Sequence, residues 1–68
     1  MKNSDLWKKR GQRIRNGRLA KGLFQKDLAK LLGVGVSAIS DYELGLKKID
    51  FDDIKLLCKM LDIDIATL

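Results

Sequence analysis

Apolar residues along the chain recur at spacings of three and four, which is the period of an amphipathic α-helix. No segment alternates between apolar and polar positions in the way that a half-buried strand would. The pattern therefore predicts an all-α fold, a compact bundle of four to five short helices in one domain. The expected helices cover residues about 5–21, 25–32, 36–44 and 51–61, followed by a short terminal turn at 65–68.

The predicted helix ends carry residues that are typical of caps. Ser4-Asp5 provides a side-chain acceptor before the first helix, and Asp50 provides one before the fourth, with Asp53 forming a weak variant of the capping box. Asp64 is expected to cap the terminal turn. The positions where a left-handed residue would end a helix are Gly22, Gly33, Gly45 and Asp62.

The side of each helix that should face the core follows from the same spacing. Cys58 falls on this inner side, so we expect a small core residue and no redox role. Leu6, Trp7, Arg10, Ile14 and Arg18 share one side of the first helix. The apolar sides of the other helices are predicted to consist of Leu28, Ala29, Leu31 and Leu32; Ile39 and Tyr42; and Phe51, Ile54, Leu57, Cys58 and Leu61.

The segment between residues 25 and 44 has the spacing of a helix-turn-helix. Ala29 is small enough for the next helix to approach, and Gly33 can adopt the left-handed turn four residues later. Val34 would plug the turn, while Ile39 and Tyr42 would pack the third helix onto the second. An ordinary helical hairpin is the alternative, but it would not require all of these residues together.

Composition limits the function classes. A chain of 68 residues has one core and little room for a catalytic cleft. With one cysteine and no histidine, it offers neither a disulfide nor a plausible zinc site. No signal peptide, membrane span, nucleophile–base pair or phosphate-cradling loop is evident. We therefore expect a cytoplasmic protein, or a domain of a longer one, that is no enzyme and has no cofactor, membrane partner or evident small-molecule ligand.

Charge is unevenly distributed along the chain. Residues 1–30 contain ten Lys or Arg against two Asp, which gives +8, whereas residues 31–68 contain four Lys against seven acids, which gives −3. A basic half of this kind suits a polyanion such as nucleic acid or an acidic membrane surface. A merely solvated helix face would have the same composition.

These motifs resemble the Cro and phage-repressor type of helix-turn-helix, also called the xenobiotic-response-element family or lambda repressor-like fold. The resemblance covers roughly residues 8–68 and implies a transcriptional regulator, of repressor or controller type, that binds double-stranded DNA as a homodimer. It rests on Arg13-Ile14-Arg15, Lys21 to Ala29, Leu32-Gly33-Val34, Ile39 to Gly45, and Leu56 to Ile63.

Site residues follow from the resemblance, which implies that the third helix enters the major groove. Arg18 and Glu43 match an interhelical salt bridge near the DNA backbone, which we interpret as structural first. Pairing of two copies would use Ile63, Ile65 and Leu68 at the C-terminus. The implied base-contacting residues are Val36, Ser37, Ser40 and Asp41, and the implied phosphate-contacting residues are Gln25, Lys47, Lys48, Arg10 and Arg15.

Several residues depart from the family pattern. Phe24 stands where Ser or Thr usually caps the second helix, so it should pack into the core or against a partner. Gly35 replaces a common polar cap of the third helix. Gly17 stands where a large apolar residue is usual, and either Trp7 or Phe24 is expected to fill the space. Trp7 itself is interpreted as a core or staple aromatic, with a partner-binding anchor as the alternative.

The reading helix is the largest departure. Its sequence VSAISDYE has no Arg, Lys, Asn or Gln, the residues that make the best bidentate contacts to guanine and adenine. Two hypotheses remain open. Either the domain reads DNA through weak contacts and shape, or it is a protein-interaction module of the same fold with little DNA affinity.

Overall fold

The computed structural model describes residues 3–68, and these form helices joined by short loops, with no strand in the described part. The all-α prediction is confirmed. Four α-helices are followed by one turn of 3-10 helix: α1 (Asn3–Ala20), α2 (Gln25–Leu32), α3 (Val36–Leu44), α4 (Phe51–Leu61) and η1 (Ile65–Thr67). The bounds of α2, α3 and α4 coincide with those expected from the apolar pattern.

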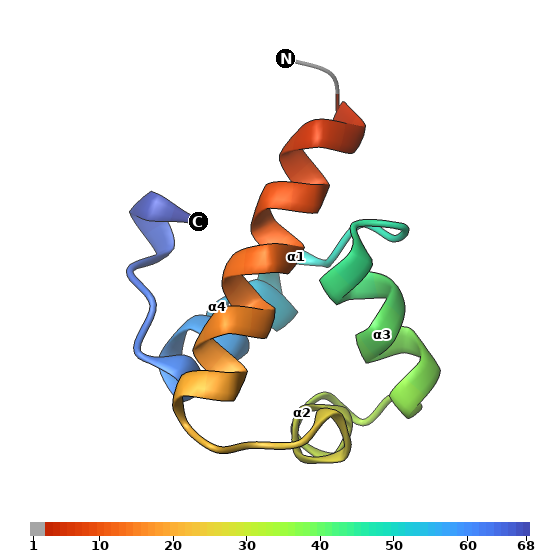
Figure 1. Ribbon diagram of the computed structural model, residues 1–68, viewed down its shortest axis with the longest axis vertical. Coiled ribbons are helices and arrows are strands. Elements are labelled where there is room, and N and C mark those ends of the chain that lie inside the picture. Colours follow the sequence, from red (N-terminus) through yellow and green to blue (C-terminus); the bar gives the residue numbers. More distant parts are fainter. Residues whose placement is uncertain (1–2) are drawn as a thin grey trace.

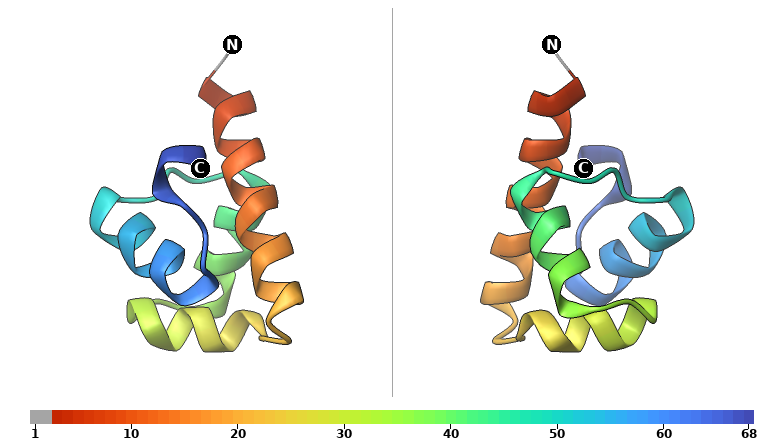
Figure 2. Two further views of the ribbon diagram at one scale, coloured as in Figure 1. Left: turned by 90° about the vertical axis from the view of Figure 1, so that its left-hand side faces the viewer. Right: turned by 90° about the vertical axis from the view of Figure 1, so that its right-hand side faces the viewer.

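The long helix α1 organises the arrangement. In Figure 1, α3 lies on one side of α1 and α4 on the other, while α2 is seen end-on below them. Figure 2 shows α2 lying across this lower end of the molecule and the C-terminal segment turning back beside α1. One fully buried aliphatic side chain from each helix meets at the centre, and these four are Ile14, Leu28, Ile39 and Leu57, all less than 2% exposed.

The C-terminal helix ends are as predicted. Gly22, Gly33 and Gly45 have φ values of +68°, +68° and +74°, and Asp62 has a φ of +55°. Asp64 also caps the last turn, because its side chain accepts a hydrogen bond from the backbone N–H of Ala66. Residues tolerant of left-handed backbone therefore mark where these helices stop.

The N-terminal caps differ from the prediction. The helix α1 already includes Asn3, so Ser4 and Asp5 lie within its first turn and do not precede it. Asp50 does occupy the N-cap position of α4, but its side chain makes no capping bond, and Asp53 completes no capping box. Asp50 is exposed, so water can solvate the N–H groups in the first turn of α4. Asp52 and Asp53 still complement the helix dipole.

Two apolar residues expected inside, Leu31 and Phe51, lie on the surface, and so does Phe24, for which the core was one of two expectations. Leu31 is 38% exposed because α2 is short and turns only Leu28 and Ala29 fully inward. Phe51 is 65% exposed at the first position of α4, with the Lys55 ammonium 5.1 Å from its ring centroid. Phe24 is equally exposed and therefore does not pack into the core.

Phe24 also lacks a side-chain cap, but the start of α2 keeps one polar contact. The side chain of Asp27 accepts a hydrogen bond of 2.7 Å from the backbone N–H of Phe24. Lys26 lies over the Phe24 ring, 5.4 Å from its centroid. Half of a capping box thus replaces the missing hydroxyl.

Two glycines of α1 mark close approaches. A Cβ on Gly11 would lie 2.6 Å from the carbonyl oxygen of Glu43, so the backbones of α1 and α3 touch there. A Cβ on Gly17 would lie 3.1 Å from Cδ1 of Ile63. The space beside Gly17 is therefore filled by Ile63, and the expectation that Trp7 or Phe24 fills it is wrong. Nothing in the helical pattern of α1 signals a partner that lies 46 residues away in sequence.

These glycines give a matched pair of stability tests. Alanine at either site gains about 1 kcal/mol of helix propensity. Gly11→Ala must also push two backbones apart, and we expect it to lower the free energy of unfolding by about 2 kcal/mol. Gly17→Ala meets only side-chain atoms and should change stability by less than about 1 kcal/mol. Urea unfolding followed by circular dichroism measures both, and equal effects would contradict the backbone contact.

Candidate functional site

The unit formed by α2, its turn and α3 has the expected internal packing. Ala29 is buried, and its carbonyl oxygen accepts a hydrogen bond of 3.0 Å from the N–H of Val34. Gly33 supplies the left-handed residue between the helices, and Ile39 is buried against the same core. Val34 and Tyr42 are half-buried beside it. The spacing that predicted a helix-turn-helix thus corresponds to real contacts.

A buried ion pair fixes the end of α3 to α1. The Nε of Arg18 donates to Oε2 of Glu43 at 2.6 Å, and Nη2 donates to Oε1 at 3.0 Å. Such a bidentate geometry satisfies both the guanidinium and the carboxylate. The hydrogen bond that Arg18 donates to Glu43 is the main reason that the pKa of Arg18 is raised, against the opposing effect of burial.

The start of α2 joins the same cluster. The Nη1 of Arg18 donates to the carbonyl oxygen of Leu23 at 3.0 Å, and Nε2 of Gln25 donates to Oε1 of Glu43 at 3.1 Å. One arginine therefore contacts both α3 and the loop before α2. The cluster therefore ties the C-terminal end of α3 to α1 and to the N-terminal end of α2.

The outward face of α3 carries the residues predicted to contact bases. Val36 is 46% exposed and Ser37 is also exposed, whereas Ser40 and Asp41 are half-buried. Gly35 occupies the N-cap position with extended backbone. The first turn of α3 carries no acidic residue, so the acidic character of this face begins only at Asp41. All four residues therefore lie on α3, with the two at its N-terminus exposed and the two further along only partly accessible.

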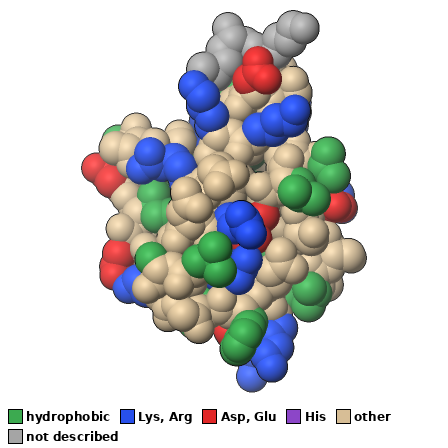
Figure 3. Space-filling model, viewed as in Figure 1, with side chains coloured by type: hydrophobic (Ala, Val, Ile, Leu, Met, Phe, Trp, Pro, Cys, Tyr) green, Lys and Arg blue, Asp and Glu red, His purple; other side chains and the backbone are tan. Residues whose placement is uncertain are grey.

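The predicted phosphate contacts do not share one environment. Arg15, Lys47 and Lys48 are exposed, and Gln25 is half-buried in the ion-pair cluster. Figure 3 shows Lys and Arg side chains distributed along α1 and at the lower end of the molecule, with hydrophobic groups between them. Arg10 differs from the others, because it lines a pocket and makes a stacking contact there.

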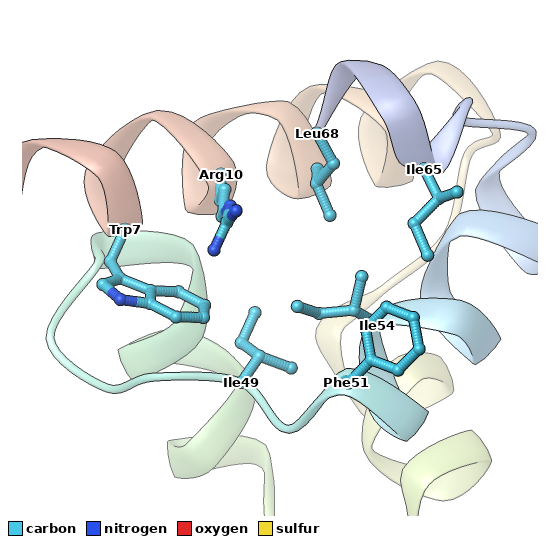
Figure 4. A pocket seen from close by; sticks show the side chains of 7 residues that line it. All are labelled: Trp7, Arg10, Ile49, Phe51, Ile54, Ile65 and Leu68. Atoms are coloured by element: carbon cyan, nitrogen blue, oxygen red, sulfur yellow. The ribbon is translucent and has the colours of Figure 1, made fainter. Parts of the chain in front are cut away.

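This pocket is the main feature that sequence reasoning missed. It has a volume of about 270 Å³ and lies between α1, α4 and the C-terminal segment (Figure 4). The guanidinium carbon of Arg10 lies 4.8 Å from the ring centroid of Trp7. The spacing of Trp7 and Arg10 was the one local signal, since it places both on the same side of α1. Its lining is formed by Trp7, Arg10, Ile49, Phe51, Ile54, Ile65 and Leu68.

Trp7 combines features of both hypotheses made for it. The residue is half-buried and packs against the core cluster, as a core aromatic would. The same ring also forms part of the pocket wall (Figure 4). Trp7 is therefore a structural residue whose remaining surface is available to a ligand or partner.

Other candidate chemistry finds little support in the described part of the chain. Cys58 is buried as predicted, and burial, followed by the nearby charge of Asp64, raises the pKa of its thiol. Within residues 3–68, no group of acidic or cysteine side chains could hold a metal ion. No helix in this range is long and apolar enough to cross a membrane.

Comparison with protein families supports the fold assignment. A family model described as helix-turn-helix matches residues 14–68, which is most of the chain and includes the whole α2–turn–α3 unit. A search of curated proteins finds none that matches. The resemblance noted in the sequence is thus confirmed at the level of the family.

The ion pair leads to a prediction about stability. Glu43→Gln leaves the buried Arg18 guanidinium without a counter-charge, and we expect the free energy of unfolding to fall by about 3 kcal/mol. The double variant Arg18→Met/Glu43→Met removes both charges and should recover most of that loss. Urea unfolding of the two variants provides the comparison. If the double variant is less stable than Glu43→Gln, the ion pair contributes more to the free energy of unfolding than the compensation of two buried charges.

Proposed function

The chain belongs to the Cro/repressor-type helix-turn-helix family, and on this premise we propose that it is a transcriptional regulator that binds double-stranded DNA sequence-specifically. One observation carries the proposal. The C-terminal half of α3 is held against α1 by Glu43 and the Gly11 contact, while the residues of its N-terminal half that face outward are open. A helix that is held on its inner side and exposes the outer side of its N-terminal half can enter a major groove, which admits an α-helix.

The side chains proposed to contact bases are short. Val36 would contact a thymine methyl group, and Ser37 and Ser40 would hydrogen bond to base edges. Asp41 would accept a hydrogen bond from a cytosine amino group. These contacts discriminate weakly, so we propose that DNA shape and deformability provide part of the specificity.

The proposed phosphate contacts flank the reading helix. The amide nitrogen of Gln25 has two N–H donors, of which one bonds to Glu43, so the other is available to a phosphate at the start of α2. Lys47, Lys48 and Arg15 are exposed and would add charge contacts. Arg10 is left out of this set, because it lines the pocket between α1 and α4.

A homodimer would place two reading helices on two half-sites. Of the residues expected to pair, Ile63 is used within the chain to cover Gly17, so Ile65 and Leu68 would carry the contact. Sedimentation velocity tests this part of the proposal. We expect a dimer of the 7.7 kDa chain at high protein concentration, and a single 7.7 kDa species there would remove it.

A protein-interaction module is the second candidate function. It is favoured by the lack of bidentate base-reading residues in α3 and by the exposed Leu44 and Leu46 at its end. Exposed aliphatic residues of this kind are common at protein contacts. This candidate and DNA binding differ in one measurable property, affinity for duplex DNA.

Titration of a labelled mixed-sequence duplex, followed by fluorescence anisotropy, tests the DNA proposal. Because phosphate contacts release counterions, affinity should fall steeply between 50 and 200 mM salt, by roughly 10²-fold or more for four to six contacts. Lys47→Ala/Lys48→Ala should weaken binding at least about tenfold and reduce the salt dependence by about two counterions.

The matched control is Lys55→Ala/Lys59→Ala on α4. This control also removes two positive charges, but from exposed positions outside the proposed contact surface. We expect this control to change affinity by less than about threefold. Absence of binding to any duplex at 50 mM salt would overturn the DNA proposal in favour of a protein partner. Equal losses in the two double variants would show that the phosphate contacts lie elsewhere.

A further inference from the structure

The pocket between α1 and α4 has apolar walls and a single charged group. Ile49 and Ile54 are buried at its base, whereas Phe51 and Ile65 are exposed at its mouth. No acidic residue lines it. The guanidinium of Arg10 thus faces hydrocarbon, without a carboxylate opposite it.

Arg10 is held in place but incompletely satisfied. Its guanidinium stacks on Trp7, at 4.8 Å from the ring centroid, and Figure 4 shows its nitrogens directed into the space between Trp7 and Leu68. The Nε of Arg10 is buried and has no hydrogen-bond partner in the described part of the chain. A buried charged donor without an acceptor is unfavourable, and a carboxylate on the terminal guanidinium nitrogens would place a compensating charge beside it through charge-assisted hydrogen bonds.

The size of the pocket limits the ligand. A cavity of about 150 Å³ holds a benzene molecule. By that measure, about 270 Å³ accommodates roughly ten non-hydrogen atoms. Charge and size together indicate a compact organic anion with a hydrocarbon body.

We propose that this pocket is a binding site for a small apolar monocarboxylate, with the carboxylate on Arg10 and the hydrocarbon between Phe51, Ile54 and Ile65. None of the residues proposed to contact DNA lines the pocket, whereas Ile65 and Leu68, which are proposed to pair two copies, do line it. Pockets that bind small molecules are commonly apolar with a few polar groups that fix orientation. Ligands of this size typically bind in the micromolar to millimolar range.

Trp7 is the one tryptophan of the chain and lies in the pocket wall, so its fluorescence reports occupancy directly. Titration with octanoate should change Trp7 emission saturably. Octanol and octylammonium have the same chain length without the negative charge, and each should bind at least about tenfold more weakly. Backbone amide NMR shifts should locate the octanoate response at the lining residues.

Two pairs of variants test the role of charge. Arg10→Met keeps much of the side-chain stem and should weaken octanoate binding at least about tenfold, whereas Arg15→Met on the same helix should leave binding unchanged. Ile65→Asp places a negative charge at the exposed mouth and should weaken binding, while the neutral Ile65→Asn should do so less. Ile65 is at the surface, so this second pair remains informative if Arg10→Met fails to fold.

Three results would overturn the proposal. The first is equal affinity for octanoate and octanol, which would indicate apolar partitioning alone. The second is octanoate affinity that is the same in Arg10→Met and in the unmodified protein. The third is Trp7 emission that responds to protein concentration but not to octanoate, which would show that a second copy covers the pocket.

Discussion

The position of α3 against α1 is the constraint on which the rest of the structure depends. Two different contacts impose it. At Gly11 the helix backbones touch, which leaves no room for a side chain, and one turn of α3 is thereby set at a fixed distance. The Arg18–Glu43 pair then fixes direction and register, because a bidentate bond between two buried groups tolerates little displacement.

The buried pair need not contribute much net stability. Removing two charges from water is costly, and their attraction returns that cost only when the geometry is good and the remaining donors are satisfied. Here the third nitrogen of the Arg18 guanidinium also has a partner, since Nη1 donates to the carbonyl oxygen of Leu23. A domain of this size has a small core, so apolar packing alone would specify its helix positions weakly. The pair is best understood as a device that selects one arrangement of three helices.

Local sequence could predict the helices but only part of their packing. Gly33 and Gly45 could be predicted as helix ends because the left-handed backbone at each position depends on that residue alone, and glycine adopts it readily. The exposed Phe51 could not be predicted in this way, because an apolar residue at the start of α4 looks the same in sequence whether or not another element covers it. Gly17 is a similar case, since its partner, Ile63, is brought there by the tertiary fold.

The candidate site was also predicted only in part. The Arg18–Glu43 ion pair was predicted correctly through family resemblance. The base and phosphate contacts stay predictions, because they depend on a second molecule and not on the fold of this chain alone. Arg10 shows why a count of basic residues is insufficient. Arg10 and Arg15 lie on the same helix and have the same charge. The Arg10 side chain stacks on Trp7 inside a pocket, whereas Arg15 is exposed.

The segment between α3 and α4 links the two surfaces of the molecule. Lys47 and Lys48 are exposed, but the next residue, Ile49, is buried in the core and forms part of the pocket. A short segment anchored by one aliphatic side chain cannot place its lysines independently of that anchor. The core therefore determines where the two positive charges lie, and the same side chain that shapes the pocket also positions the proposed phosphate contacts.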